Sequence, residues 1–519
     1  MWRKDLQFRR PGASRELPSC LGVLRRCIFG WPARAWQLRI GTIVKRPILL
    51  ISFVCGLLLS VAPVTAADKA RVFKAGAATS NITPRLGTSM NGGMQDRAAT
   101  HIHDELHARC LALDDGKTRL VIVTCDTCLL PREVADAAKK LVHEELGLPV
   151  ENILIAATHT HSGGTLTPAF QSDPDQVYPP FVVRRVADGI RRAVNNLAPA
   201  KIGWGACRVP DEVFNRRWKL KEGTMPPNPF GKIDKVKMNP GVGNANLIEP
   251  AGPTDPEVSI VSVVSPDGRP IALLANYSLH YCGGATAGAI SADYFGMFAD
   301  RIQELLKADR LDPPFVGMMS NGTSGDINNV NFRGPAAKFA PYEKMRKVAH
   351  HVADEVMRVY PSIQHRDGVV LAVRQTELKL GVRKPAPDEV TRAKEIMAKA
   401  KKAPVMTTAE EIYARETVQM ANYPDEVSII LQAMRIGDLA ITATPCETFV
   451  EIGLELKQKS PIKPQFTIQL ANGYNAYLPT PEQHALGGYE TWRAKSSYLE
   501  AGASPKIVAT LLGLLEQLK

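Results

Sequence analysis

Apolar and polar residues along positions 73–519 follow two periods, which predict strands and helices in turn. Short apolar runs bounded by turn residues are typical of buried strands, and they predict strands at 119–124, 152–157, 314–319 and 369–380. Apolar residues three and four positions apart are typical of amphipathic helices, and they predict helices at 131–146, 178–197, 293–307, 342–359, 446–457 and 505–518. Residues 387–421 predict two helices joined near Pro404.

Two further segments predict β-hairpins. Residues 257–279 hold two apolar runs around Ser265-Pro266-Asp267-Gly268, and residues 428–444 hold two around Gly437-Asp438. Pro, Asp and Gly each suit bent backbone, so both turns have a physical cause. These mixed ββ and βα connections, without a sustained repeat, predict an α/β (mixed α+β) fold with a large mixed β-sheet core flanked by helices.

The chain contains no segment that reads as a linker between domains. No Gly/Ser-rich or Pro-rich stretch interrupts residues 70–519, so residues 67–519 are predicted to form a single catalytic domain. Residues 223–254 are rich in Pro, Gly and Asn and predict a long loop rather than a boundary, and loops of that length are often functional.

Composition places the chain among ordinary globular proteins. It has 519 residues, of which 45% are hydrophobic and 22% charged, which excludes disordered, collagen-like and polytopic membrane proteins. The net charge of +12 comes mainly from residues 1–46, which hold eleven Lys or Arg against two acidic residues. Of the totals of 64 basic and 52 acidic residues, 53 and 50 remain from Ala67 onward. This near balance removes the argument for a nucleic-acid partner.

The basic segment is followed by the pattern of an export signal. Residues 47–61 form an apolar run, and Val64-Thr65-Ala66 ends in small residues typical of a cleavage site. The run is shorter than the roughly 20 apolar residues of a membrane-spanning helix. Residues 1–66 are therefore predicted to be a basic leader plus a cleaved signal peptide, and the body to be exported (periplasmic or secreted). An uncleaved N-terminal anchor is the less favoured alternative.

Six cysteines remain after the predicted cleavage: Cys110, Cys125, Cys128, Cys207, Cys282 and Cys446. An exported protein can form disulfides, but most of these cysteines lie in apolar runs without framework spacing, which predicts buried free thiols. Cys125-Asp-Thr-Cys128 resembles a redox pair, but a single such pair is weak support, and a zinc ribbon would need a second pair.

The densest chemical signal is Thr158-His159-Thr160-His161-Ser162-Gly163-Gly164, directly after the predicted strand at 152–157. Histidines two positions apart lie on one face of an extended segment, and α/β sheets bind ligands at strand ends. Both histidines can therefore face one site. Metal binding and a hydrogen-bonded structural histidine both remain open at this point, because a metal needs further ligands.

Other strand ends supply candidates for those further ligands. His280 follows the apolar run that ends the first hairpin, and Glu447 follows another predicted strand and begins a predicted helix. On local grounds Glu447 is explained as an acidic residue that complements the dipole of the first helical turn. A second pair, His101 and His103, is interpreted as structural.

A set of short motifs resembles one family. In order along the chain they are Asn81-Ile82-Thr83-Pro84, Ile102-His103-Asp104-Glu105-Leu106-His107-Ala108-Arg109, the THTH motif, Asn215-Arg216, Gly325-Asp326-Ile327-Asn328-Asn329 and Asn475-Ala476-Tyr477-Leu478-Pro479-Thr480. Over residues 73–500 or so this order resembles the catalytic domain of the neutral/alkaline ceramidases, the non-lysosomal zinc amidases.

The resemblance implies a set of site residues and a reaction. It implies one zinc ion per chain, with the ligands His159, His280, Glu447 and Tyr477. It further implies that His161 is an acid/base or substrate contact, that Arg216 orients the substrate and that Tyr489 hydrogen-bonds the oxyanion. The expected reaction is hydrolysis of an amide (N-acyl) bond by a zinc-activated water.

Two departures from the family pattern bear on the substrate. Where ceramidases have a serine that contributes to catalysis, this chain has Asn328, which could donate a hydrogen bond but has no hydroxyl. No C-terminal immunoglobulin-like domain is expected, since the chain ends about thirty residues after Tyr489. Both departures put ceramide itself in question.

Several functions therefore stay open. A small-molecule or lipid N-acyl substrate is expected, with peripheral contact to a membrane surface as a further possibility. One alternative is a metal hydrolase of another ester, N-acyl or phosphoester substrate on the same scaffold, and another is a non-catalytic exported binding protein. A cluster of lysines near the long loop is interpreted as a solvated surface, or alternatively as a contact for an anionic or glycan-type substrate: Lys219, Lys221, Lys232, Lys235 and Lys237.

Overall fold

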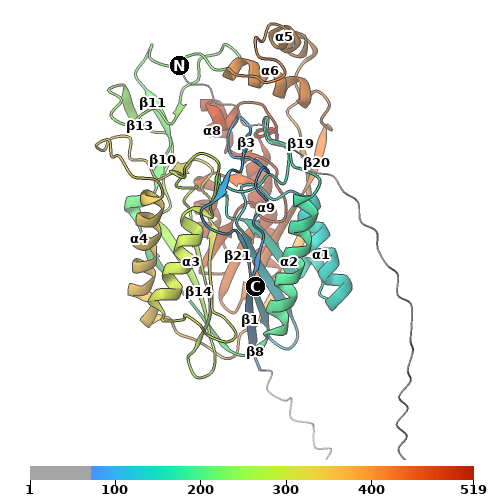
Figure 1. The fold of residues 1–519 in the computed structure, drawn as a ribbon, viewed down its shortest axis with the longest axis vertical. Coiled ribbons are helices and arrows are strands. Elements are labelled where there is room, and N and C mark those ends of the chain that lie inside the picture. Colours follow the sequence, from blue (N-terminus) through green and yellow to red (C-terminus); the bar gives the residue numbers. More distant parts are fainter. Residues whose placement is uncertain (1–71) are drawn as a thin grey trace, which may run out of the picture. The chain divides into compact units, whose positions relative to one another are not determined.

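Three four-stranded arrangements of the same topology build the protein, in a computed structural model that describes residues 72–519 (Figure 1). In each, a first strand pairs with an antiparallel hairpin, and a helix then leads to a last strand parallel to the second strand of the hairpin. The first sheet consists of β7 (Ile153–Ala157), β6 (Arg119–Cys125), β5 (His107–Asp114), β1 (Lys74–Asn81) and the short β8 (Ala198–Pro199).

The other two sheets repeat this order. The second consists of β17 (Val316–Asn321), β15 (Pro270–Tyr277), β14 (Glu257–Val264) and β9 (Lys201–Arg208). The third consists of β23 (Gln465–Ile468), β21 (Leu439–Ala443), β20 (Glu426–Ile436) and β19 (Leu371–Gly381). The longest pairing, β19 with β20, runs without a break from Leu371 opposite Ile436 to Gly381 opposite Glu426.

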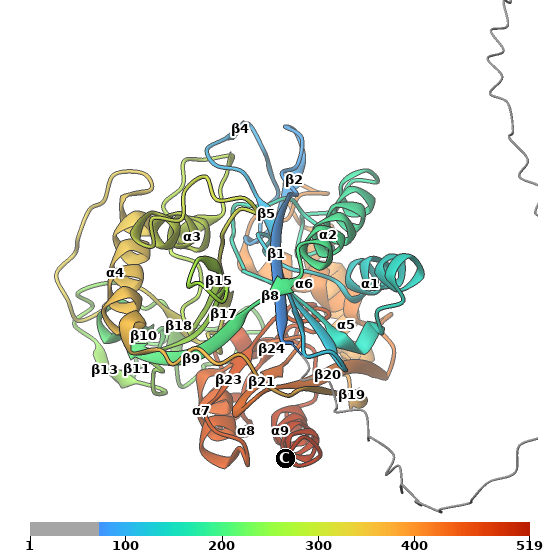
Figure 2. The same cartoon turned by 90° about the horizontal axis from the view of Figure 1, so that it is seen from below.

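Helices cover the outer face of each sheet, as Figure 2 shows along the strands. These helices are α1 (Arg132–Leu146) and α2 (Tyr178–Asn195) on the first sheet, α3 (Asp293–Leu305) and α4 (Glu343–Val359) on the second, and α7 (Val450–Lys459) and α9 (Ala503–Glu516) on the third. The inner faces of the three sheets share one apolar core, which includes Leu111, Ile122, Leu274, Met318 and Ile441. Burial of these side chains is what holds the three sheets together.

The polar residues predicted to form the site follow strands that end on the same side of the three sheets. The second strand of each hairpin is parallel to the last strand of its sheet, so the carboxyl ends of these two strands lie at the same end of the sheet. The segments that join the first strand of each sheet to its hairpin, residues 82–106, 209–256 and 382–425, also leave from this end. They contain β2 (Ser89–Met90), β3 (Arg97–Ala98), β4 (His101–Ile102), β10 (Phe214–Asn215), β11 (Arg217–Leu220), β12 (Lys237–Met238), β13 (Leu247–Pro250), α5 (Pro387–Ala398) and α6 (Ala409–Met420).

The remaining strands and one helix are short and follow the carboxyl ends of β15, β17, β21 and β23. They are β16 (Ala289–Ile290), β18 (Ile327–Asn328), β22 (Glu447–Thr448), β24 (Tyr477–Leu478) and α8 (Pro481–Leu486). Among the described residues no helix is long and apolar enough to cross a membrane.

The predicted fold class is confirmed: the protein is mixed α/β, and the predicted strands, helices and hairpins are present. Two expectations were wrong. Glu447 does not begin a helix, because it lies in β22 and α7 starts at Val450. The connections do repeat, but the repeat is one of topology. The segment 223–254 is a long loop interrupted by β12 and β13.

Two further predictions concern the termini and the cysteines. The basic leader and signal peptide at residues 1–66 lie outside the described residues, so they stay predictions. All six cysteines of the described chain are free thiols, five of them buried and Cys282 partly so. This agrees with the absence of framework spacing in the sequence.

Candidate metal centre

His159 lies just beyond the end of β7 and is held in an unusual backbone conformation. Its φ is 77°, in the left-handed region that costs a non-glycine residue about 1–2 kcal/mol. Two hydrogen bonds keep it there: its backbone N–H donates to the carbonyl of Thr127 at 2.9 Å, and its Nδ1–H donates to the carbonyl of Cys128 at 2.7 Å. In the neutral ring this bond places the proton on Nδ1 and leaves the Nε2 lone pair free for a metal ion.

His280 lies beyond the end of β15 and is oriented in the same way. Its Nδ1–H donates to the carbonyl of Ser324 at 2.9 Å, so its Nε2 lone pair is also free. The two Nε2 atoms are 3.0 Å apart. Two lone pairs that face each other at this distance repel one another, unless a cation lies between them or one of the rings is protonated.

Glu447 completes the cluster from the third sheet. Its Oε2 lies 3.2 Å from Nε2 of His159 and 3.7 Å from Nε2 of His280, and it is buried without a hydrogen-bond donor. The other oxygen, Oε1, accepts a hydrogen bond from the hydroxyl of Tyr474 at 3.3 Å. A buried carboxylate oxygen without a donor is costly, and a metal ion would satisfy it.

The spacing of these ligand atoms fits a zinc ion. Two ligands bound tetrahedrally at about 2.0–2.1 Å from zinc lie about 3.3 Å apart, close to the 3.0–3.7 Å found here. Burial lowers the pKa of His280, and the charges of His159 and Arg216 lower it further. Its ring is therefore neutral near pH 7, as a metal ligand must be. Burial also acts to lower the pKa of His159, but Cys128 and Glu447 outweigh it and raise that pKa, so His159 is the ring that holds a proton until a metal ion displaces it. His159, His280 and Glu447 thus form a candidate metal centre, with one residue from each sheet.

Tyr477 lies next to this cluster, because β24 pairs in parallel with β22 and brings Tyr477 opposite Glu447. Its hydroxyl accepts a hydrogen bond from Nη2 of Arg216 at 3.2 Å. Burial raises the pKa of Tyr477, and the charge of Glu447 raises it further. Tyr477 lines the same pocket as His159 and Glu447, and its role as a metal ligand stays a prediction.

Arg216 is fixed by three buried partners. Its Nε donates to Oε1 of Glu490 at 2.8 Å, and its Nη2 donates to the carbonyl of Gly325 at 2.8 Å as well as to Tyr477. Glu490 also accepts a bond from Nη1 of Arg217 at 2.6 Å. The guanidinium of Arg216 is thus held beside the metal centre before any substrate binds.

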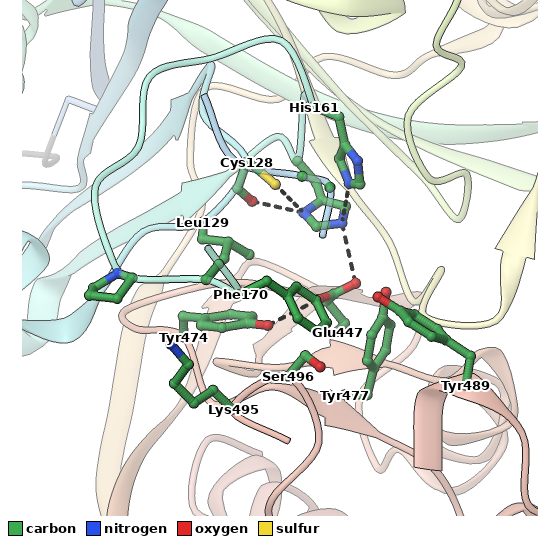
Figure 3. A pocket seen from close by; sticks show the side chains of 15 residues that line it. Cys128, Leu129, His161, Phe170, Glu447, Tyr474, Tyr477, Tyr489, Lys495 and Ser496 are labelled. Atoms are coloured by element: carbon green, nitrogen blue, oxygen red, sulfur yellow. Dashed lines mark hydrogen bonds and ion pairs between the residues drawn. The ribbon is translucent and has the colours of Figure 1, made fainter. Parts of the chain in front are cut away.

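His161 faces the centre from the THTH motif (Figure 3). Its Nε2 is 3.2 Å from Nε2 of His159, and its ring stacks on Tyr281 with centroids 3.6 Å apart. Burial lowers the pKa of His161 well below its usual value, so the ring is neutral near pH 7. His161, Cys128 and His159 form a second possible ligand group. In that group the thiol of Cys128 lies near Nδ1 of His159, but this nitrogen already donates a hydrogen bond to the carbonyl of Cys128.

The two remaining predicted residues differ in position. Tyr489 lines the pocket and meets Tyr477 edge-on, with ring centroids 5.8 Å apart. Asn328 does not line this pocket. Its amide donates to Oδ1 of Asn239 at 2.7 Å, and its own Oδ1 accepts a bond from the backbone N–H of Val330. A catalytic role of Asn328 stays a prediction, and its hydrogen-bonding groups are engaged elsewhere.

Sequence reasoning missed Tyr474, Tyr281 and Glu490. Tyr474 lies three residues before Tyr477, in the same segment after β23, and this repeat of tyrosines was the available signal. Tyr281 directly follows His280. Glu490 directly follows Tyr489, but its pairing with two arginines more than 270 residues away has no local signature.

Removing the hydroxyl of Tyr474 is expected to weaken metal binding. Tyr474→Phe leaves Oε1 of Glu447 without its donor, and the loss of such a supporting hydrogen bond typically costs 10–100-fold in metal affinity. Competition with a chromophoric chelator measures the affinity. Tyr277→Phe is the control, since its buried hydroxyl bonds the carbonyl of Val209 away from the centre. Equal affinities for the two variants would contradict the assignment.

Comparisons with known proteins bear on the family. The sequence model described as neutral/alkaline non-lysosomal ceramidase, N-terminal, matches residues 73–341. A neutral ceramidase from Pseudomonas aeruginosa shares the fold, with a TM-score of 0.66 and 18% identity over 86% of this chain and 74% of that one. A ceramidase complexed with C2 is similar, with a TM-score of 0.64 and 16% identity over 86% and 75%. The family match covers just over half of the chain, and the protein belongs to the neutral/alkaline non-lysosomal ceramidase family.

Proposed function

We propose that this protein is an exported, zinc-dependent hydrolase that cleaves an amide (N-acyl) bond. Membership of the ceramidase family supports a ceramidase-type amidohydrolase. The observation that carries the zinc assignment is the convergence of two imidazole lone pairs and one carboxylate oxygen, from His159, His280 and Glu447, within 3.7 Å of one another. Export rests on the leader pattern in the sequence alone.

When bound there, zinc supplies a Lewis acid that lowers the pKa of water towards 7. The chain's own residues supply the rest. Arg216 is fixed by Glu490 and the carbonyl of Gly325, so its positive charge is oriented in advance towards the negative charge that develops on the carbonyl oxygen. Tyr489 lines the pocket next to Tyr477 and can donate a second hydrogen bond to that oxygen. Donors fixed in advance in a buried site are an effective form of catalysis.

His161 is the residue best placed to move protons. Its ring is neutral near pH 7, its Nε2 faces the centre, and stacking on Tyr281 holds the plane of the ring. A neutral imidazole can accept the proton released by the attacking water and pass it to the leaving amine. Water therefore adds OH to the carbonyl carbon, the C–N bond breaks, and the products are a carboxylic acid and an amine.

The hydrogen bonds of Asn328 favour a second candidate function. Its amide bonds Asn239 and Val330, and this position has no hydroxyl, so chemistry that uses a serine here is closed. A metal hydrolase that acts on another ester or N-acyl substrate is therefore the alternative to ceramide hydrolysis. Both candidates use the same centre.

Removal of the metal tests the proposal. The purified protein is expected to contain about one zinc ion per chain by elemental analysis. Dialysis against a chelator should abolish hydrolysis of a fluorescent N-acyl substrate, and one equivalent of zinc should restore it. Magnesium serves as the control ion, because it prefers oxygen ligands and does not suit an imidazole site. A metal-free protein that refuses added zinc would overturn the proposal.

A further inference from the structure

Two cavities of different size meet at His161. The first contains the metal centre and has a volume of about 50 Å³, whereas the second has a volume of about 370 Å³. Both are lined by Gly92, Gly93 and His161. The residue proposed to carry a proton to the leaving amine therefore forms a wall between two unequal spaces.

The small cavity has the walls of an acyl pocket. It is lined by Leu129, Pro168 and Phe170 together with three tyrosines, Tyr474, Tyr477 and Tyr489. An apolar cavity of about 150 Å³ holds a benzene ring, so a cavity of about 50 Å³ has room for only a few carbon atoms. That is the size of a short acyl chain.

The wall at Phe170 is firmly supported. Phe170 is 7% exposed and packs in a cluster with Met406, Ile412, Tyr413 and Ala494. Its carbonyl accepts a hydrogen bond from Nη1 of Arg415 at 2.6 Å. Close-packed side chains of this kind give way only at a cost in free energy, so the cavity does not open easily on this side.

Lys495 also lines the small cavity and disfavours a long alkyl chain. Its side chain is 13% exposed, and its ammonium is 3.6 Å from Oε1 of Glu416. An alkyl chain that covered this ion pair would remove its remaining contact with water without offering a hydrogen bond, which is unfavourable. The charge of Lys495 thus disfavours an apolar chain on this side of the small cavity.

The large cavity has a mixed lining, with Met90, Met94 and Tyr281 among its apolar and aromatic residues. It contains the polar side chains of Gln95, Arg97, Ser162 and Thr286, together with exposed backbone at Gly92, Gly93, Gly283 and Gly284. Such a surface offers donors and acceptors to hydroxyl groups, and its glycines allow close approach. It suits the polar amine portion of a substrate.

From this we infer that the preferred substrate is a short-chain N-acyl derivative of a polar, hydroxylated amine, with an acyl group of about two to four carbons in the small cavity. The inference rests on the proposed amide hydrolysis and specifies the substrate class of the same site. A long-chain N-acyl lipid would have to leave much of its acyl chain outside the small cavity.

A chain-length series tests this substrate class. Amides of one polar amine, glucosamine, carry acyl groups of two, four, six and eight carbons, all short enough to stay in solution, and the released amine is measured with the zinc-loaded protein. We expect kcat/KM to be highest at two or four carbons and at least about 100-fold lower at eight. A value that stays level or rises with chain length would overturn the inference.

A variant that enlarges the small cavity provides the matched comparison. Phe170→Ala is expected to move the preferred length to six or eight carbons, and Phe170→Leu is a milder change in case the first variant does not fold. Phe230→Ala removes a similar ring from the neighbouring cluster without lining this cavity, so its preference should match the wild type. The same preference in the Phe170 variants and the wild type would contradict the acyl-pocket assignment.

Equilibrium binding separates the inference from the proposed function. Calorimetry with the same amides measures affinity whether or not they are cleaved. Tighter binding of short amides by a protein that does not hydrolyse them would support the pocket and refute the hydrolase. Zinc binding and turnover with a preference for eight carbons would support the hydrolase and refute the pocket. A protein that binds none of the series would refute the inference.

Discussion

Replacing His159 with alanine is expected to remove bound zinc and to lower kcat/KM for an N-acyl substrate by about 10³-fold or more. Its Nε2 lies closest to the other ligand atoms, at 3.0 Å from His280 and 3.2 Å from Glu447. Without it the centre keeps one imidazole and one carboxylate, and loss of a Lewis acid removes several kcal/mol of transition-state stabilisation. Each 1.36 kcal/mol is a tenfold change in rate.

Elemental analysis and steady-state kinetics on the same preparations measure the two effects. The fold should survive, because the backbone N–H of residue 159 keeps its hydrogen bond to the carbonyl of Thr127, and circular dichroism can verify this. His350→Ala on α4 is the control, since this histidine lies outside the candidate ligand groups. Zinc retained at full occupancy in His159→Ala would refute its role as a ligand.

Replacing Glu490 with glutamine is expected to destabilise the fold by about 3–5 kcal/mol. Glu490 is fully buried and bonds both Arg216 and Arg217, of which Arg217 is also fully buried. Removing the carboxylate charge leaves two guanidinium groups without their partner in a site closed to water. Urea unfolding followed by circular dichroism gives the change in the free energy of unfolding.

An exposed ion pair provides the control for Glu490. Glu249 pairs with Lys219 at 2.8 Å on the surface, and exposed pairs contribute little to stability. Glu249→Gln should therefore leave the urea midpoint at the wild-type value. A Glu490→Gln variant as stable as Glu249→Gln would show that the buried pair does not hold the fold together.

The pH dependence of stability follows from the same pair. Burial acts to raise the pKa of Glu490, but the charges of Arg217 and Arg216 outweigh it and lower the pKa below its usual value of 4.5. A group with a lowered folded-state pKa stabilises the fold above its unfolded-state pKa and loses that contribution as the pH falls through the folded value. The wild type should therefore lose stability below about pH 4.5 by more than Glu490→Gln does.

Local patterns in the sequence predicted the elements well, but not how they are arranged. The hairpin of β14 and β15 and the helix α1 depend on residues that are neighbours in the chain. The threefold repeat of topology depends on which strands pair across the chain, and the three sheets share no repeated residue pattern that would reveal it. The hydrophobic periodicity therefore predicted the individual strands and helices, but not the topology that the three sheets share.

The residues of the candidate site also fall into those that local sequence predicts and those that depend on contacts between distant parts of the chain. His159 and His161 were identified because they follow a strand at a spacing that faces one site. Glu447 was misplaced in a helix because an acidic residue before an apolar period resembles a first helical turn, whereas the observed β22 exists only through its pairing with β24. Tyr474 was missed although Tyr477 follows it three residues later, because its function depends on a contact with Glu447, 27 residues away.

The segment between β19 and β20 has a consequence for how the substrate selectivity of this protein can evolve. The two strands are in register up to Gly381 and Glu426, so the segment that contains α5 and α6 leaves the sheet and rejoins it at one point. That segment supplies Met406 and Tyr413 behind Phe170 but none of the proposed metal ligands or proton carriers. Exchanging it whole would alter which molecules fit while leaving the reaction intact, so selectivity can evolve here separately from chemistry.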